Sequence, residues 1–133
     1  MQRRMSRSRF ADAGVMAAKD ALGRQGETIA REHLLSRGMA VLECNWRCSQ
    51  GEIDIVAREG DELVFVEVKT RSGIGYGHPF AAITPVKLAR MRRLAAAWCE
   101  ARPGVRAGIR LDAVAVMVPP RGDVTVEHLV GIG

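Results

Sequence analysis

The chain has little of what several familiar classes of protein require. Among its 133 residues are three cysteines, Cys44, Cys48 and Cys99, and their spacing matches neither a zinc motif nor a redox motif. We expect buried, reduced thiols, with a weak metal role for Cys44 and Cys48 as the open alternative. No G-x-G-x-x-G follows a predicted strand and no βα unit repeats, which argues against a Rossmann fold and a TIM barrel.

Long apolar segments are missing as well. The uninterrupted apolar runs are brief, such as residues 94–99, so nothing in the sequence should span a membrane. Residues 1–19 are rich in arginine, but no apolar stretch of signal-peptide length follows the first arginines. We therefore expect a cytoplasmic protein without a membrane partner. Residues 1–19 would be a disordered basic tail or the result of a misplaced start codon, and residues 20–133 a single domain.

Two strand-like runs lie between residues 51 and 70. Every second position is apolar, as in half-buried strands, with Ile53, Ile55 and Ala57 in the first run and Val64, Val66 and Val68 in the second. A two-residue turn at Gly60 and Asp61 would join the runs into an antiparallel hairpin. In that register, residues whose numbers add up to 121 lie opposite each other, as 59 and 62 do.

This register places Asp54 opposite Glu67 on the polar face of the hairpin. Directly opposed residues have Cβ atoms about 4.5–5.5 Å apart, and like charges at that distance repel each other. Lys69 follows on the same face, about 7 Å along the strand. Because the second run is apolar up to Glu67, this acid should be buried, and a buried acid beside another acid needs a compensating cation. We favour a metal site; the alternative is an ordinary hairpin whose charges face water.

These residues and the segment before them resemble a known family. The strings GEIDIVA, VFVEVKTR and GRQGETIAREHLLSRGMAVLECNWR look like the YraN family, a bacterial group assigned to the PD-(D/E)XK nuclease superfamily. The resemblance extends from about Gly23 to the end of the chain. It implies that Asp54 and Glu67 bind a divalent metal, Mg²⁺ or Mn²⁺, and that Lys69 orients or activates the attacking water. Glu27 matches a helix glutamate that similar Holliday junction resolvases add to the metal site.

The sequence departs from the family pattern in two places. Ile53 stands where the proline that names the superfamily would precede the aspartate. Ala81 and Ala82 stand where an acidic residue is expected after Gly-x-Pro, so any role of that acid is lost or taken over elsewhere. Glu27 also has a second interpretation, because it could form a helix-surface pair with Arg31, four residues later.

Basic residues are concentrated in two parts of the chain. The net charge is +5, but residues 1–19 contribute +4 of it, from five basic residues and one acid. The second concentration lies between Glu67 and Glu100, where there is no acid. The basic residues in that interval are Lys69, Arg71, Lys87, Arg90, Arg92 and Arg93. This local asymmetry is better evidence for nucleic-acid binding than the charge of the whole chain.

Most of these basic residues belong to a predicted helix. Thr84 can cap it, and Pro85 favours its first position. Its core face would consist of Leu88, Met91, Ala95 and Trp98. Its basic stripe consists of Lys87, Arg90 and Arg93, which we predict to contact phosphates together with Arg71. The alternative for the stripe is a solvated helix face.

The remaining sequence predicts scaffold. We expect a first helix over residues 20–37, a strand over 39–46, and two strands over 109–118 and 124–129. Asp112 interrupts an apolar run and should pair with a nearby arginine rather than join the metal site. The order α-β-β-β-α-β-β predicts an α/β fold with a mixed sheet flanked by helices. This agrees with the restriction-endonuclease-like fold that the resemblance implies.

The residues and the resemblance together predict a Mg²⁺- or Mn²⁺-dependent endonuclease that hydrolyses DNA, including branched or otherwise structured DNA. Carboxylate oxygens suit these hard cations. The expected partner is DNA, with a second copy of the chain forming a homodimer if both strands are cut. The alternatives are a non-catalytic nucleic-acid-binding or scaffold module that keeps the fold, and a nuclease that acts on RNA. The sequence leaves the substrate structure and any sequence preference open.

Overall fold

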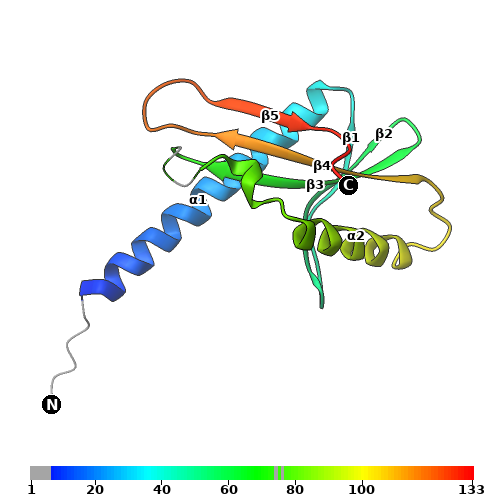
Figure 1. Cartoon of the computed structure of the whole chain (residues 1–133), viewed down its shortest axis with the longest axis horizontal. Coiled ribbons are helices and arrows are strands. Elements are labelled where there is room, and N and C mark those ends of the chain that lie inside the picture. Colours follow the sequence, from blue (N-terminus) through cyan, green and yellow to red (C-terminus); the bar gives the residue numbers. More distant parts are fainter. Residues whose placement is uncertain (1–6, 74, 76) are drawn as a thin grey trace, which may run out of the picture.

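A five-stranded mixed sheet lies between two helices in the computed structural model, which describes residues 7–73, 75 and 77–133 (Figure 1). In chain order the elements are α1 (Arg7–Ser36), β1 (Ala40–Cys48), β2 (Gly51–Glu59), β3 (Glu62–Arg71), the short 3-10 helix η1 (Pro79–Ala82), α2 (Pro85–Glu100), β4 (Gly108–Met117) and β5 (Thr125–Leu129). The predicted α/β class and the order α-β-β-β-α-β-β are confirmed.

The strand order in the sheet is β1-β2-β3-β4-β5. β3 and β4 pair in parallel, from Glu62↔Gly108 to Arg71↔Met117, whereas the other neighbours pair antiparallel. Parallel neighbours need a crossover connection, and the chain supplies η1 and α2 between these strands. Because helices cover both faces, β3 is buried without interruption over residues 63–68. This explains why its sequence is apolar on both faces up to Glu67.

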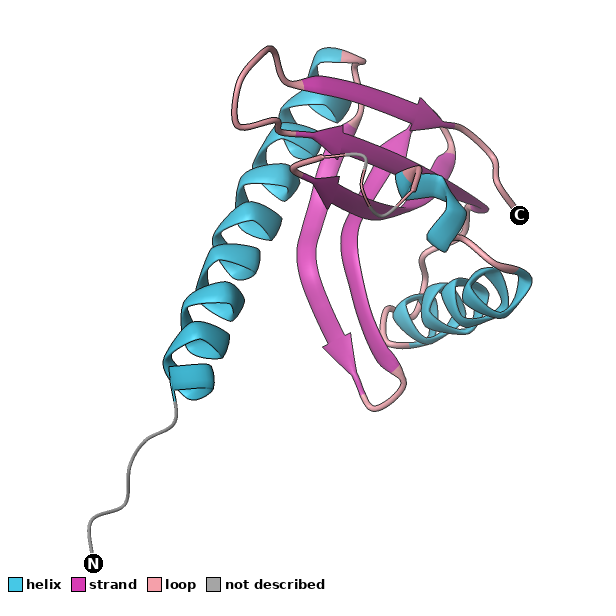
Figure 2. Ribbon diagram, turned by 60° about the vertical axis from the view of Figure 1, so that its left-hand side comes forward, coloured by secondary structure: helices cyan, strands magenta, loops and turns pink. Residues whose placement is uncertain are grey.

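Two apolar cores lie on opposite faces of the sheet, one under each helix (Figure 2). The core under α1 contains Ala30, Leu34, Ile55, Ala57, Val64, Val66, Val68, Val114 and Val116. The core under α2 contains Val56, Leu63, Phe65, Met91, Leu94, Ala95, Trp98 and Leu111. Neighbouring β3 residues alternate between the cores because strand side chains point to opposite faces in turn. Glu67 therefore belongs to the face that α2 covers.

α1 approaches β3 closely at a single glycine. Gly26 is buried, and a Cβ atom at this position would overlap the side chain of Thr70. Only glycine allows this approach without a shift of the helix or the strand. The contact fixes α1 beside the carboxyl end of β3, so the next helix residue, Glu27, is held near the same end.

α1 begins earlier than the sequence analysis predicted. It starts at Arg7 rather than near residue 20, so residues 7–19 are helical and not part of a disordered tail. This segment has no proline and is rich in alanine, the strongest helix former. Residues 1–6, the rest of the predicted tail, lie outside the described residues. The other end of α1 agrees with the prediction, because Gly38 follows it with a φ of 91°, a conformation that favours glycine.

Two further predictions concern membrane spans and the burial of the cysteines. Within the described ranges, no helix is both long and apolar enough to cross a membrane. The three cysteines are free thiols, but Cys44 is exposed and the other two are partly exposed, so the expected burial was wrong. Cys44 and Cys48 lie on β1, an edge strand on which every residue is at least partly exposed.

Candidate metal centre and nucleic-acid groove

The side chain of Asp54 lies where β2 separates from β3. The predicted register holds from Glu59↔Glu62 to Ile55↔Val66, and the ladder ends just before Asp54 and Glu67 would pair. Beyond this point β2 stays paired with β1 alone. The Asp54 carboxylate replaces a backbone acceptor for β3 at this point, because its Oδ2 accepts a hydrogen bond from the backbone N–H of Val68 at 2.8 Å.

Glu67 is a buried acid with two lysines beside it. Its residue is 8% exposed, on the face of β3 that α2 covers. Lys69 Nζ lies 3.7 Å from Glu67 Oε1, and Lys87 Nζ, from the first turn of α2, lies 3.0 Å from the same oxygen. The two ammonium groups therefore share one carboxylate oxygen. This pairing offsets part of the desolvation cost of the buried charge.

Asp54 has a strongly perturbed pKa. Burial raises it most, the negative charge of Glu67 raises it further, and the hydrogen bond from Val68 lowers it; with smaller contributions from Glu27 and Glu52, the pKa rises from 3.8 to about 7. Among the described residues, no basic side chain forms an ion pair with Asp54. Burial and the neighbouring acids therefore keep the pKa of this carboxyl group close to neutral pH.

A groove of about 570 Å³ runs between α1 and the carboxyl end of β3. Its lining includes Glu27 on α1 and both Lys69 and Arg71 on β3. Asp54 and Glu67 are not part of the lining, whereas Lys69, whose ammonium group lies 3.7 Å from Glu67 Oε1, is. Glu27 contributes to the field at Asp54 without a direct contact.

Arg71, which also belongs to the lining of the groove, has an unpaired polar atom. Its Nε is buried and has no hydrogen-bond partner within the part of the chain that the structure describes. A buried donor without an acceptor is costly, and native structures rarely keep one without a reason.

The predicted basic stripe on α2 does not form one uniform surface. Thr84 caps the helix through a 3.2 Å hydrogen bond from the N–H of Lys87, and Pro85 is its first residue, as predicted. Lys87 turns toward Glu67, whereas the Arg90 guanidinium lies against Gly51, the first residue of β2. Arg93 is exposed to solvent.

The donor atoms near Asp54 do not form a complete metal cage. No three His, Cys, Asp or Glu side chains in the described ranges converge closely enough to hold an ion by themselves. Asp54 and Glu67 supply two carboxylates, and Glu27 stands farther off. Mg²⁺ is commonly held by one or two carboxylates, with waters and substrate phosphates as its other ligands. The donor set therefore fits a hard divalent cation that is bound in this open manner.

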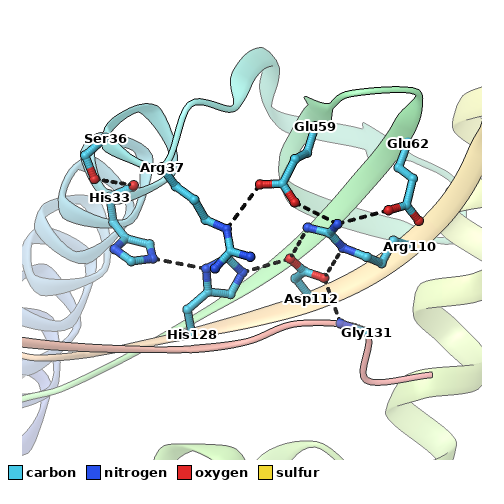
Figure 3. Close-up of polar contacts among 9 residues, drawn as sticks. All are labelled: His33, Ser36, Arg37, Glu59, Glu62, Arg110, Asp112, His128 and Gly131. Carbon is cyan, nitrogen blue, oxygen red and sulfur yellow. Dashed lines mark hydrogen bonds and ion pairs between the residues drawn. The ribbon is translucent and has the colours of Figure 1, made fainter.

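A second buried acid, Asp112, lies on the opposite face of the sheet, under the end of α1 (Figure 3). It is fully buried, and the predicted pairing with an arginine is confirmed by contacts of 2.9 and 3.0 Å from Arg110. The N–H of Gly131 donates at 3.0 Å and His128 Nε2 lies at 2.7 Å. Burial alone would raise the pKa of Asp112, but these hydrogen bonds outweigh it and hold the pKa below its ordinary value.

The Asp112 network extends to α1 and to the turn between β2 and β3. His128 Nδ1 lies 3.0 Å from Nε2 of His33 on α1. Arg110 also contacts Glu59 at 2.9 Å, and Glu59 in turn pairs with Arg37 at 3.1 Å. Burial and two neighbouring basic groups, His128 and Arg37, lower the pKa of His33. The cluster thus ties α1, β4 and the segment after β5 together.

Glu52, two residues before Asp54 on β2, adds negative charge near Asp54. One contact of the acidic site escaped the sequence analysis. The contact between Lys87 and Glu67 had no indication in the sequence, because it joins a helix to a strand across the core.

These features define an α/β domain with a buried acidic site beside a groove at the end of its central strand. A family model described as "Uncharacterised protein family UPF0102" matches residues 26–116. A UPF0102 protein of Arthrobacter sp. (strain FB24) is 54% identical over 121 residues, which cover 89% of this chain and 100% of the relative. A UPF0102 protein of Kineococcus radiotolerans is 54% identical over 116 residues, covering 86% and 95% of the two chains. The chain belongs to the UPF0102 family.

Proposed function

We propose that this protein is a metal-dependent endonuclease that hydrolyses phosphodiester bonds in DNA, including branched or otherwise structured DNA. The observation that carries the proposal is the position of Lys69. Its ammonium group lies 3.7 Å from the buried Glu67, and the residue is also part of the lining of the groove beside α1. A phosphate in the groove would therefore contact a residue whose side chain is already paired with the acidic site. The resemblance to the YraN family and to the PD-(D/E)XK nuclease superfamily supports the same assignment.

Asp54 and Glu67 are the proposed metal ligands, with Glu27 as a more distant contributor. When bound, Mg²⁺ or Mn²⁺ would polarise the scissile phosphate and lower the pKa of a bound water. The raised pKa of Asp54 supports this role, because carboxylates that repel each other accept a divalent cation at the expense of a proton. A two-carboxylate site also leaves room for water and a phosphate oxygen.

The basic residues have separate proposed tasks. Lys69 would hold the attacking water or offset negative charge that develops on the phosphorus centre. Arg71, which lines the groove, would donate to a phosphate oxygen there. Lys87, Arg90 and Arg93 on α2 would contact the backbone of the nucleic acid outside the groove. These contacts carry no base information, so they favour DNA structure over DNA sequence as the recognised feature.

A non-catalytic nucleic-acid-binding or scaffold module is the second candidate. Two observations favour it: Ala81 and Ala82 replace an acidic residue that the family resemblance predicts, and Lys87 rather than a further ligand pairs with Glu67. Such a module would bind nucleic acid in the groove without cutting it. RNA is a third possibility for the substrate, and matched DNA and RNA oligonucleotides in competition distinguish the two.

The proposal predicts that Lys69→Ala lowers cleavage by about 100-fold or more, the usual effect of removing a positioned acid–base group. The assay compares linear, nicked, flapped and four-way branched DNA, with Mg²⁺, Mn²⁺ or chelator present. Arg121→Ala changes an exposed residue in the loop between β4 and β5. It is the matched control and should cut like the parent. Circular dichroism checks that both variants stay folded.

Two results would decide against a nuclease. If Lys69→Ala cuts every DNA form as fast as the parent, Lys69 has no part in catalysis. If the parent binds branched DNA but cuts none of the forms with either metal, the non-catalytic module is the better description.

A further inference from the structure

Lys87 forms the tightest contact of the acidic site. Its ammonium nitrogen lies 3.0 Å from Glu67 Oε1, compared with 3.7 Å for Lys69. Its side chain is 26% exposed, so part of it reaches solvent while its end reaches a nearly buried carboxylate. Lys87 is therefore the principal counter-charge of Glu67 in the metal-free protein.

The place of Lys87 in its helix is electrostatically unfavourable. It lies in the first turn of α2, where the helix dipole disfavours positive charge, and no acidic residue shares that turn. Its own N–H is already occupied by the Thr84 cap. Helix formation therefore gives no reason for a lysine here. The contact with Glu67 gives one, because the carboxylate offsets the unfavourable position of the cation.

The same contact also conflicts with metal binding. A divalent ion of this kind binds carboxylate oxygens at about 2.0–2.1 Å. An ammonium group at hydrogen-bond distance from Glu67 Oε1 occupies the side on which such an ion would bind. Lysine is suited to give way, because it is a point charge on a flexible four-carbon stem, whereas arginine would hold a carboxylate through a rigid two-donor fork.

We propose that Lys87 is a stand-in cation, which neutralises Glu67 in the metal-free protein and moves to a phosphate of the nucleic acid when a divalent ion takes its place. This inference rests on the proposed metal site. It adds a coupling between ligands: the metal releases the ammonium group that the nucleic acid needs, so each ligand strengthens the binding of the other. Lys69, which lines the groove and is farther from Glu67, stays in place.

The coupling makes an unusual prediction, that loss of Lys87 improves metal binding. Lys87→Met keeps the length and the apolar stem of the side chain but removes the competing charge. Titration calorimetry should show Mn²⁺ binding that is roughly fivefold tighter or more than in the parent, a typical size for coupling between ligands. Arg90→Met removes a cation from the same helix without touching Glu67, so it is the control and should change Mn²⁺ affinity much less.

A direct readout of the movement is available because the chain contains only three lysines, Lys19, Lys69 and Lys87. In protein labelled with ¹³C at lysine Cε, each gives its own resonance, and single substitutions assign them. Addition of diamagnetic Mg²⁺ should shift the Lys87 resonance toward the position of a solvated lysine. The Lys19 resonance should hardly move.

The outcomes separate this inference from the proposed function. If the parent binds Mn²⁺ but Lys87→Met binds it no more tightly, or if the Lys87 resonance stays fixed while Mg²⁺ binds, the stand-in role is wrong and the metal site stands. If the parent binds neither Mn²⁺ nor Mg²⁺, the metal site and the stand-in role both fail. Tighter Mn²⁺ binding together with the Lys87 shift supports both.

Discussion

Asp112 is a fully buried acid and Asp54 is a half-buried one, and the polar groups that surround them differ in kind. Asp112 receives hydrogen bonds from Arg110, from the N–H of Gly131 and from His128, and its pKa is held low. Asp54 has one backbone donor and three acidic neighbours, and its pKa rises to about 7. One carboxylate is satisfied by the protein itself, whereas the other is not.

The difference indicates which cluster holds the fold and which one serves a ligand. A satisfied buried network fixes the elements that it joins, here α1, β4 and the chain after β5. Asp54, by contrast, is repelled by neighbouring acids, which is unfavourable for folding, and such perturbed groups concentrate at functional sites. We therefore assign stability to the Asp112 cluster and propose metal binding for the Asp54 cluster.

The largest expected change in unfolding free energy is at Asp112. Asp112→Asn removes the negative partner of Arg110 within a buried network, and breaking such a pair typically costs about 3–5 kcal/mol of unfolding free energy. Urea denaturation monitored by circular dichroism measures the loss. Asp123→Asn, an exposed acid on the loop before β5, is the control and should change stability little. A loss at Asp112 no larger than that of the control would mean that the network does not hold the fold.

At Asp54, in metal-free buffer, we expect a substitution to raise the stability of the fold rather than lower it. Because its folded pKa is raised from 3.8 to about 7, the native state keeps a proton that the unfolded state releases, and stability falls as the pH rises through this window. Asp54→Asn removes this penalty while its amide oxygen can still accept from Val68. Its melting temperature should exceed that of the parent by about 3–5 °C above pH 7, the shift that roughly 1 kcal/mol produces in a domain of this size.

The pH profile distinguishes this explanation from a general gain in stability. The advantage of Asp54→Asn should shrink as the pH falls and should vanish only well below the unfolded-state pKa of 3.8, where the parent carboxyl group is protonated in both states. Thermal melts in chelator at several pH values provide the comparison. An advantage that is equal at pH 4 and pH 8 contradicts the assigned cause.

Much of the fold could be predicted because local patterns determined it. The alternation in β2 and β3 with the turn at Gly60 gave the correct register, and Thr84 with Pro85 gave the correct start of α2. The start of α1 was missed because the basic charge of residues 1–19 suggested a tail.

The candidate site was only partly predictable, because it depends on contacts between distant segments. The register placed Asp54 near Glu67, and the Glu-x-Lys spacing placed Lys69 beside it. The separation of β2 from β3 at Asp54 depends on the twist of the assembled sheet, which periodicity does not encode. The contact of Lys87 with Glu67 depends on how α2 packs, so no local pattern could reveal it.

The central claim is that Asp54 and Glu67 bind a divalent cation, and thermal melting in Mn²⁺ tests it most directly. A ligand at 100 times its dissociation constant stabilises the folded state by about 2.7 kcal/mol, so saturating Mn²⁺ should clearly raise the melting temperature of the parent. Asp61→Asn, which changes an exposed acid in the turn between β2 and β3, should respond like the parent, whereas Asp54→Asn should not respond. An equal rise in Asp54→Asn, or none in the parent, would contradict the claim.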